Sequence, residues 1–187
     1  MQKIILASQS PRRRQLLEWA EVDFEVVVSH ADESFQPELS FEEAAMFIAR
    51  NKATAVANTH GNERPILAAD TIVVCSNEIL GKPSGREEAI KFLNRLSGNT
   101  HQVITGVCLL ANNTELTFAD ITTVSFHPLT SEQITFYVDK YQPFDKAGAY
   151  AIQEWIGVVG IKSIKGDFYN VMGLPVSRVM HALARLG

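Results

Sequence analysis

The pattern of apolar and polar residues at the start of the chain predicts a buried strand followed directly by a helix. Residues 4–7 are four consecutive apolar side chains, as in a strand covered on both faces. Ser10 fits the N-cap of a helix, and Pro11 fits the first helical position, where no backbone N–H is needed. We therefore expect strand, short loop and helix in that order.

A second helix is predicted from residue 40 to about residue 57. Ser40 and Glu43 have the spacing of a capping box, in which each side chain bonds the backbone N–H of the other residue. Lys52 lies on an apolar row of this helix, because the residues four positions before and after it are apolar. Either its stem packs there while the ammonium reaches solvent, or the ammonium reaches an anion.

An acidic residue interrupts one apolar run of the chain. Residues 66–69 and 72–75 are apolar, and Asp70 and Thr71 lie between them. Burying a carboxylate costs free energy unless it is paired, hydrogen-bonded or bound to a metal. Some buried carboxylates are structural, but Asp70 is the best candidate in this sequence for a general base.

The rest of the chain mixes predicted helices and strands, which indicates an α/β protein. Ser84 and Glu87 have the spacing of a further capping box. Residues 101–126 favour a long β-hairpin that turns at Asn112 and Asn113 and extends a central sheet. The other predicted elements are a strand at 24–28, a helix from 130 to about 138, a strand at 156–164 and a final helix starting at 173–175.

Three arginines follow Pro11, where acidic residues would be more favourable. The N-terminus of a helix carries partial positive charge, so a cation there costs roughly 0.3–1 kcal/mol. An anion held by Ser8, the helix N–H groups and the guanidinium groups of Arg12 and Arg13 would offset that cost. A solvated basic helix start is the alternative, and Arg14 is expected to be a surface residue.

Composition bounds the class of protein. With 187 residues, 46% of them hydrophobic, the chain suits one domain or two lobes that share a core. The formal net charge of −4 argues against a general nucleic-acid binder, which needs a broad basic surface. No apolar run approaches the ~20 residues of a membrane span, and residues 1–20 lack the layout of a signal peptide. Cys75 and Cys108 stand alone in apolar runs, which predicts reduced core residues of a cytoplasmic protein.

Charged residues recur at the ends of predicted strands and on the inner faces of predicted helices. Such a mixture suits a polyphosphate and a hard divalent metal, because Mg²⁺ binds one or two carboxylates together with phosphate oxygens and water. The residues alone therefore indicate a metal-assisted hydrolase of a nucleotide-like phosphate, or a protein that only binds one. The cations are Arg12, Arg13, Lys52, Lys82 and Lys146, and the carboxylates are Glu33, Asp70 and Asp145.

Six short motifs follow one another along the chain. They are SQSPRR at 8–13, DES at 32–34, AADT at 68–71, GKP at 81–83, DKAGAYAIQ at 145–153 and GLP at 173–175, with Lys52 between the second and third. Taken together they resemble the Maf family of nucleoside triphosphate pyrophosphatases, once called septum-formation inhibitors. The resemblance implies a two-lobed α/β/α architecture with a central mixed sheet and a cleft between the lobes. It also implies a single domain over residues 1–187, a homodimer, and hydrolysis of a nucleotide to its monophosphate and pyrophosphate.

Within that family the chain resembles the dTTP/UTP branch. The branch that acts on methylated GTP typically has tryptophan where this chain has Arg12. In the dTTP/UTP branch, the positions that match Arg12, Thr71 and Gln153 are associated with substrate choice, and the position that matches Asp70 with the catalytic base.

These considerations give a set of expected site residues. We expect water to attack the α-phosphorus while Asp70 takes its proton, and the attack at α rests on the resemblance alone. A divalent cation, Mg²⁺, Mn²⁺ or Co²⁺, is expected at Glu33 and Asp70. The expected catalytic residues are Asp70, Lys52, Lys82 and Glu33, and the expected substrate-binding residues are Ser8, Arg12, Arg13, Thr71, Asp145, Lys146 and Gln153.

Gln153 is expected to select the base. Its amide offers one acceptor oxygen and two N–H donors, which suits the adjacent donor and acceptor groups of uracil or thymine. Cytosine presents the reverse order, and a flipped amide would match it unless a neighbour fixes the orientation of Gln153.

Two other classes of function are considered. The first is a nucleotide-binding regulator of cell division or septum formation without significant turnover, in which Asp70 would only pack. The second, an RNA- or DNA-binding module, is disfavoured by the net charge and by the lack of an aromatic-studded basic sheet. We therefore expect a cytoplasmic hydrolase that prefers dTTP and UTP, with no nucleic-acid or membrane partner.

Overall fold

The structure of this chain is a computed structural model that describes residues 2–112 and 114–186, and its strands form a mixed sheet. Six strands follow the order β2-β1-β3-β5-β6-β7, and a seventh, β4, pairs with β3. β1 pairs in parallel with β2 and β3, whereas the β3–β4 and β6–β7 pairs are antiparallel. The predicted α/β class with a central mixed sheet is confirmed. The strands are β1 (Ile4–Leu6), β2 (Phe24–Val26), β3 (Ile66–Cys75), β4 (Glu78–Leu80), β5 (Thr100–Ala111), β6 (Thr114–Phe126) and β7 (Ile161–Lys165).

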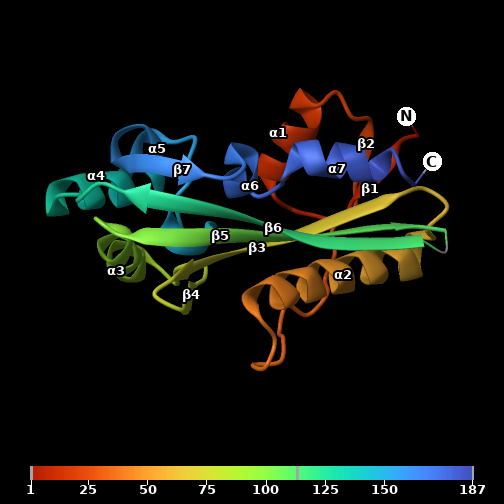
Figure 1. Ribbon diagram of the computed structural model, residues 1–187, viewed down its shortest axis with the longest axis horizontal. Helices are drawn as coiled ribbons and strands as arrows, with labels where there is room; N and C mark the ends of the chain where they lie inside the picture. The colour runs from red at the N-terminus through yellow and green to blue at the C-terminus, as the bar shows by residue number, and fades with distance from the viewer. Residues whose placement is uncertain (1, 113, 187) are drawn as a thin grey trace. The chain divides into compact units, whose positions relative to one another are not determined.

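Helices connect and flank these strands (Figure 1). In the described parts of the chain, no helix is both long enough and apolar enough to cross a membrane. The helices are α1 (Pro11–Trp19), α2 (Phe41–His60), α3 (Arg86–Leu96), α4 (Ser131–Tyr141), the 3₁₀ turn η1 (Ala147–Ala149), α5 (Trp155–Gly160), α6 (Phe168–Met172) and α7 (Val176–Leu183).

The chain divides into two compact units. Unit 1 comprises Met1–Thr71, Thr105–Asp120 and Gly173–Gly187, and unit 2 comprises Ile72–Ile104 and Ile121–Met172. β3, β5 and β6 each contribute residues to both units. Each unit therefore draws its core from segments that are far apart in the sequence.

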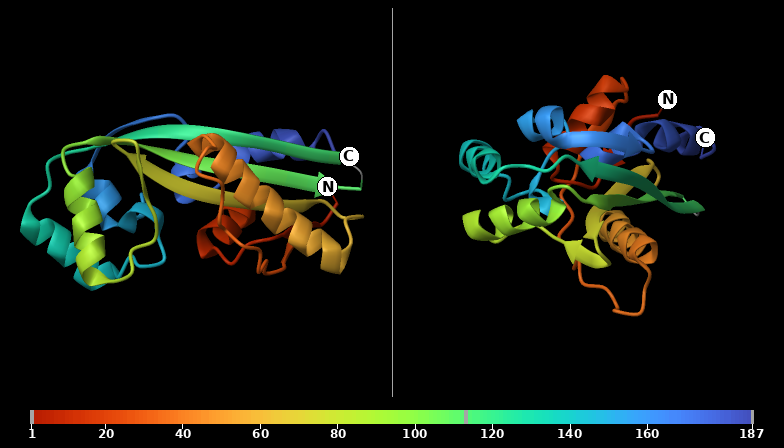
Figure 2. Two further views of the ribbon diagram at one scale, coloured as in Figure 1. Left: turned by 90° about the horizontal axis from the view of Figure 1, so that it is seen from below. Right: turned by 60° about the vertical axis from the view of Figure 1, so that its left-hand side comes forward.

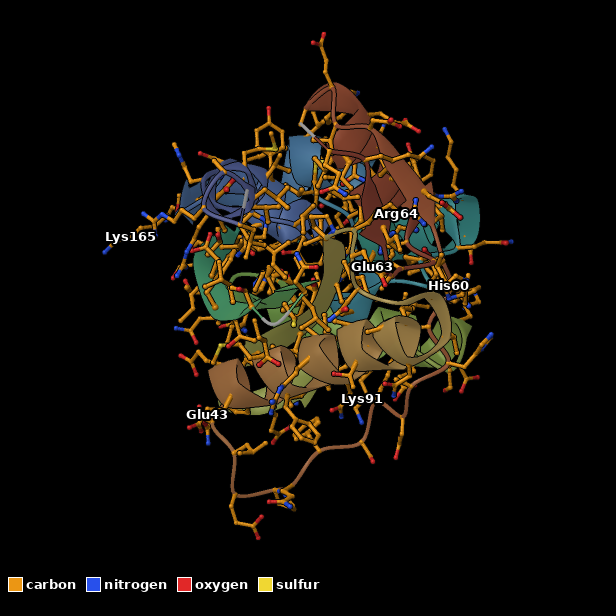
Figure 3. All side chains as sticks on the ribbon, turned by 90° about the vertical axis from the view of Figure 1, so that its right-hand side faces the viewer. Glu43, His60, Glu63, Arg64, Lys91 and Lys165 are labelled. Carbon is orange, nitrogen blue, oxygen red and sulfur yellow. The ribbon has the colours of Figure 1, made fainter. Side chains whose placement is uncertain are left out.

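In unit 1, α2 covers one face of the strands, and α1 and α7 lie on the opposite face (Figures 1 and 2). The core between α2 and the strands contains Ile5 and Ile66 from the strands and Ala49 and Ala53 from the helix, all fully buried. The alanines allow the helix to lie close to the sheet, because they add little bulk on the apolar face. Figure 3 shows Glu43 and His60 at opposite ends of this helix.

A glycine of β5 fixes the closest approach of α2 to the sheet. A Cβ atom built on Gly106 would lie 2.2 Å from the carbonyl carbon of Ala45 and 2.3 Å from the backbone nitrogen of Met46. Backbone atoms of a helix cannot give way as a flexible side chain does, so only glycine fits at this crossing. Gly106 therefore helps to set the position of α2, and with it the position of Lys52.

Most predicted helix starts are confirmed. Ser10 is the N-cap of α1 and accepts a hydrogen bond from the Arg13 N–H. Both sides of the capping box that opens α2 are present, and the same holds for Thr130 and Gln133 at the start of α4. These starts depend on residues three apart in the sequence, which is why the pattern found them.

The predicted capping box at Ser84 and Glu87 is wrong. α3 begins at Arg86, its N-cap is Gly85, and no side chain caps it. The backbone N–H and the hydroxyl of Ser84 both donate to the Glu88 carboxylate at 2.7 Å. Because the helix starts one residue later than predicted, Glu88 and not Glu87 provides the carboxylate that accepts from Ser84.

The predicted strand at 156–164 is also wrong in its first half. Residues 155–160 form α5, and β7 begins only at Ile161. A Cβ on Gly157 would lie 1.7 Å from the carbonyl oxygen of Ile152, so the missing side chain permits a tight helical turn. The apolar residues suggested a strand, but this local packing overrides that preference.

Two smaller predictions are refined. The final helix, α7, begins at Val176 with Pro175 as its N-cap, one residue later than predicted. The long hairpin is present as β5 and β6, and Asn112 in its turn has positive φ, whereas Asn113 lies outside the described residues.

Buried polar and thiol groups complete the cores. In unit 2, Nε2 of His101 and the Tyr150 hydroxyl lie 2.7 Å apart, and burial lowers the pKa of His101 to about 4. The imidazole is therefore neutral at pH 7. Cys75 and Cys108 are buried and form no disulfide, as predicted, and burial raises the pKa of the Cys108 thiol to about 12.

Replacing Gly106 by alanine should destabilise the protein by about 1–3 kcal/mol or more, because α2 must shift to admit the methyl group. Gly81 is the matched control, since no described atom outside its neighbours lies within 4 Å of a Cβ placed there. Urea unfolding followed by circular dichroism measures both variants. Equal unfolding midpoints for Gly106→Ala and Gly81→Ala would contradict the packing argument.

Candidate functional site

The centre of the candidate site in unit 1 is an ammonium group shared by two carboxylates. Nζ of Lys52 lies 2.7 Å from Oδ1 of Asp70 and 2.8 Å from Oε1 of Glu33. The side chains of Lys52 and Asp70 are only 12% and 15% exposed, whereas Glu33 is 54% exposed. Charges buried to this degree require compensation, and here the cation and the anions compensate each other.

Local sequence explains how Lys52 and Asp70 come to face each other. Lys52 projects from the apolar row of α2, as predicted, between the buried Ile48 and Val56. Asp70 continues the buried strand β3 after Ala69. Because the apolar face of α2 packs on this strand, a charged residue on each element finds its partner in the other.

Arg13 is a further charged residue held inside unit 1, and it is 8% exposed. Its Nε donates to the Gly173 carbonyl oxygen at 2.8 Å, Nη1 to the Ser8 hydroxyl at 3.2 Å and Nη2 to the Thr71 hydroxyl at 3.0 Å. Burial lowers the pKa of Arg13, and the negative charge of Asp70 opposes that shift. This one side chain therefore joins the first, third and last sequence motifs.

The loop before α1 supports Arg13. The Ser10 N–H donates to the Ser8 hydroxyl at 3.1 Å, and the same hydroxyl accepts the bond from Arg13. Ser8 is buried, whereas Arg12 is partly exposed at the start of the helix. Ser8 and Arg13 thus lie together as predicted.

Thr105 is a site neighbour that the sequence reasoning missed. Its hydroxyl lies 3.0 Å from the hydroxyl of Thr71, which also accepts the bond from Arg13. Thr105 is fully buried in β5, beside Gly106. The available signal was a polar residue inside an apolar run, the same signal that identified Asp70.

Glu33 and Asp70, the two residues predicted to hold a metal ion, provide too few ligands by themselves, so a substrate and water would have to provide the others. Glu33 and Asp70 converge on a single cation, the Lys52 ammonium. Within residues 2–112 and 114–186, no three His, Cys, Asp or Glu side chains gather as a metal-binding group. Two carboxylates with phosphate oxygens and water are nevertheless a normal Mg²⁺ environment.

In unit 2 the backbone brings two of the predicted motifs together. The Gly148 N–H donates to the Gly81 carbonyl oxygen at 3.1 Å, which joins the GKP motif to the DKAGAYAIQ motif. Gly148 has a φ of 70°, and a Cβ there would lie 3.0 Å from the Val73 side chain. Lys82 is exposed beside the buried Pro83, so its ammonium faces solvent.

Lys146 in unit 2 is buried and has carboxylate partners. Its Nζ donates to Oδ1 of Asp145 at 2.7 Å and lies 3.6 Å from Oε1 of Glu154. The hydroxyl of Tyr137 donates to the Glu154 carboxylate and accepts a bond from the Ala151 N–H at 3.2 Å. The sequence reasoning named Lys146 and Asp145 but missed Tyr137 and Glu154, for which the pattern gave no signal.

The predicted site residues therefore form two groups, one in each unit. Unit 1 brings together Ser8, Arg13, Thr71 and the Glu33–Lys52–Asp70 cluster. Unit 2 brings together Asp145 and Lys146, and it presents Gln153 as an exposed side chain. Both groups combine cations with carboxylates, as expected for residues that handle a polyphosphate and a metal.

Comparison with known proteins places this chain among related sequences. The model of the Maf-like protein family matches residues 3–186. A protein of Parabacteroides distasonis named dTTP/UTP pyrophosphatase is 48% identical over 182 residues, which are 97% of this chain and 94% of that protein. A Bacteroides fragilis protein of the same name is 49% identical over 185 residues, 98% of this chain and 96% of that protein.

A solved structure of another protein is similar in fold. The Staphylococcus aureus Ham1 protein superposes with a TM-score of 0.57 over 100% of both chains, at 15% sequence identity. At that identity the likeness concerns the arrangement of helices and strands.

Replacing Lys52 by methionine should lower stability by about 1–3 kcal/mol at pH 7, because the Asp70 carboxylate then lies largely buried without its nearest cation. Lys91 in α3, an exposed lysine labelled in Figure 3, provides the control variant Lys91→Met. Urea unfolding of both variants, of Asp70→Asn and of the double variant Lys52→Met/Asp70→Asn tests the pairing. The double variant should lose less than the two single variants together, and strictly additive losses would show that the pair does not stabilise the fold.

Proposed function

This chain belongs to the Maf family, and on that premise we propose that it hydrolyses nucleoside triphosphates to the monophosphate and pyrophosphate, with dTTP and UTP preferred. The family match covers almost the whole chain, so the resemblance found in six short motifs is confirmed. Support for the substrates comes from the relatives named dTTP/UTP pyrophosphatase, which align with 97% and 98% of this chain.

The observation that carries the proposal is the Lys52 ammonium between the carboxylates of Asp70 and Glu33. A protein that only packed its core would have no need of the largely buried Lys52–Asp70 ion pair, since apolar residues of similar volume are often as stable or more so. A bound polyphosphate would explain why Lys52, Asp70 and Glu33 are placed together. Phosphate oxygens would take over the ammonium of Lys52, and a carboxylate would then be available to a water molecule.

In the proposed reaction, Asp70 accepts the proton of the water that attacks the α-phosphorus. The α-phosphorus–oxygen bond to the β-phosphate breaks, and pyrophosphate leaves with that oxygen. Lys52 and Arg13 are cations that stabilise negative charge as it grows on the phosphate oxygens. Arg13 is well suited to this task, since three separate acceptors hold its guanidinium in one orientation.

We further propose that Glu33 and Asp70 hold a divalent cation, Mg²⁺, Mn²⁺ or Co²⁺, together with phosphate oxygens of the substrate. Such an ion would neutralise charge on the phosphates. The convergence of both carboxylates on one ammonium supports this assignment. Lys52 would leave the carboxylates when the ion is bound and turn its donors to a phosphate oxygen.

The remaining predicted residues keep substrate-binding or catalytic roles in this proposal. Lys82 presents an exposed ammonium that can neutralise phosphate charge, and Gln153 presents an exposed amide that can bond the base. Arg12 and Thr71 are assigned to substrate choice, and Asp145 and Lys146 to substrate binding. Lys146 would act through the electrostatic field of a buried, paired ammonium.

We also propose that the chain acts as a cytoplasmic homodimer with no nucleic-acid or membrane partner. The family resemblance suggests the dimer, and the net charge of −4 supports the absence of a nucleic-acid partner. Light scattering on the purified protein measures the mass, for which a value of two chains is expected.

The proposal is tested with a panel of nucleoside triphosphates and Mg²⁺, Mn²⁺ or Co²⁺, scored for pyrophosphate against orthophosphate. dTTP and UTP should give pyrophosphate and monophosphate tens- to thousands-fold faster than CTP, since a mispaired base leaves buried polar groups unsatisfied. EDTA should abolish turnover. Tight nucleotide binding without any product would favour the regulator hypothesis instead.

Asp70→Asn should reduce kcat by about 10²–10⁴-fold, the usual contribution of a positioned proton acceptor. The fold should survive, because the amide oxygen still accepts the hydrogen bond from Lys52. Asp139→Asn is the control, since Asp139 is an exposed carboxylate of α4 that pairs with Arg86 at 2.6 Å. Comparable kcat values for both variants would remove Asp70 from the mechanism.

A further inference from the structure

The hydroxyl of Tyr137 links two segments of unit 2. It donates its hydrogen to the Glu154 carboxylate and accepts one from the Ala151 N–H at 3.2 Å. The directions are fixed, because an ionised carboxylate only accepts and a backbone N–H only donates. Since the tyrosine ring is fully buried in α4, this hydroxyl ties residues 151–154 to a rigid helix.

Glu154 extends the link to the preceding loop. One carboxylate oxygen accepts the Tyr137 hydroxyl, and the other lies 3.6 Å from Nζ of the buried Lys146. Its backbone is held as well, because its N–H donates to the Ala151 carbonyl oxygen at 3.1 Å and its own carbonyl accepts from Gly157 at 2.9 Å. Glu154 is therefore fixed at its side chain and at its backbone.

Gln153 lies between two residues that hydrogen bonds and close packing hold in place. On one side is Glu154, and on the other is the buried Ile152. The Ile152 carbonyl oxygen lies so close to Gly157 that a Cβ placed on that glycine would be 1.7 Å away. The Gln153 side chain itself is exposed. The backbone of Gln153 is therefore held on both sides while its amide side chain is exposed. Such preorganisation reduces the entropy lost when a ligand binds.

We infer that Tyr137 and Glu154 are positioning residues for Gln153, and that the Tyr137–Glu154 hydrogen bond sets how well the enzyme separates uracil and thymine from cytosine. The inference rests on the proposed function and deepens it, since neither residue belongs to a recognised motif. Neither touches the substrate in this assignment. Both act by holding the backbone from which the base-reading amide projects.

Four variants distinguish the effect of the Tyr137–Glu154 hydrogen bond from the effects of neighbouring groups. Tyr137→Phe keeps the ring and removes the hydroxyl, and Glu154→Ala removes its partner. Glu154→Gln keeps an oxygen that accepts the hydroxyl but removes the charge that faces Lys146. Tyr141→Phe is the matched control, because Tyr141 lies one turn further along α4 and stacks on Tyr137 with ring centres 4.9 Å apart.

The readout is the ratio of kcat/KM for UTP to that for CTP. This ratio is independent of the fraction of enzyme that is folded, so loss of stability alone does not change it. Tyr137→Phe and Glu154→Ala should each lower the ratio roughly tenfold, while Glu154→Gln and Tyr141→Phe stay within about twofold of the parent protein. An unchanged ratio in Tyr137→Phe and Glu154→Ala overturns the inference. A loss in Glu154→Gln as large as that in Glu154→Ala would assign the effect to the Lys146 charge and also overturn it.

Amide hydrogen exchange gives a test that does not depend on turnover. The Ala151 N–H should exchange about tenfold faster in Tyr137→Phe and at the parent rate in Tyr141→Phe, because only the first variant removes its acceptor. Unchanged exchange in both variants overturns the link itself.

If the parent protein releases no pyrophosphate from any nucleotide, the proposed function fails. The inference is then decided by exchange and by calorimetric affinities for UTP and CTP: equal affinities in the parent overturn it, and a preference for UTP that Tyr137→Phe loses supports it.

Discussion

A largely buried ammonium that must be shared by two carboxylates is the constraint on which unit 1 depends. Lys52 comes from α2, Asp70 from β3 and Glu33 from the segment before α2, so three separate elements must be placed correctly for the charges to compensate. Gly106 serves this requirement, since it lets the backbone of α2 approach β5 closely. The same charges that restrict the fold are the ones a polyphosphate and a divalent ion would use, so stability and proposed catalysis place demands on the same groups.

Unit 2 compensates its buried cation differently. The partners of Lys146 are its sequence neighbour Asp145 and the nearby Glu154, so the cluster is built almost entirely within one loop and the turn after it. Tyr137 comes from α4, and its hydroxyl satisfies a buried N–H and a carboxylate together. A network of this kind suits recognition, because fully satisfied buried polar groups hold a loop in one conformation. The network in unit 1 differs, because in the proposed reaction the Lys52 ammonium would turn from the two carboxylates to phosphate oxygens.

The local predictions succeeded where the interacting residues are close in sequence. Ser10, Ser40 and Thr130 each cap a helix through a residue three positions away, and the long hairpin needs only a turn between two apolar runs. Failures occurred where packing at one position outweighs the pattern. Ser84 bonds Glu88 because Gly85 delays the start of α3. The apolar residues after Glu154 coil into α5 because Gly157 leaves room for a carbonyl oxygen, a contact that no periodicity encodes.

The sequence by itself determined the family, the α/β class, and the identity of the charged residues placed in apolar surroundings, because a charge in an apolar run or on an apolar helix face is visible without coordinates. It singled out Asp70 and Lys52 on these grounds. Only the tertiary structure decided that they are each other's partners, that Arg13 bonds Ser8, Thr71 and Gly173, that Thr105 lies beside Thr71, and that Tyr137 bonds Glu154. Some of these contacts join residues up to 160 positions apart along the chain. Their formation depends on how helices and strands pack, and the spacing of residues along one segment carries no information about that.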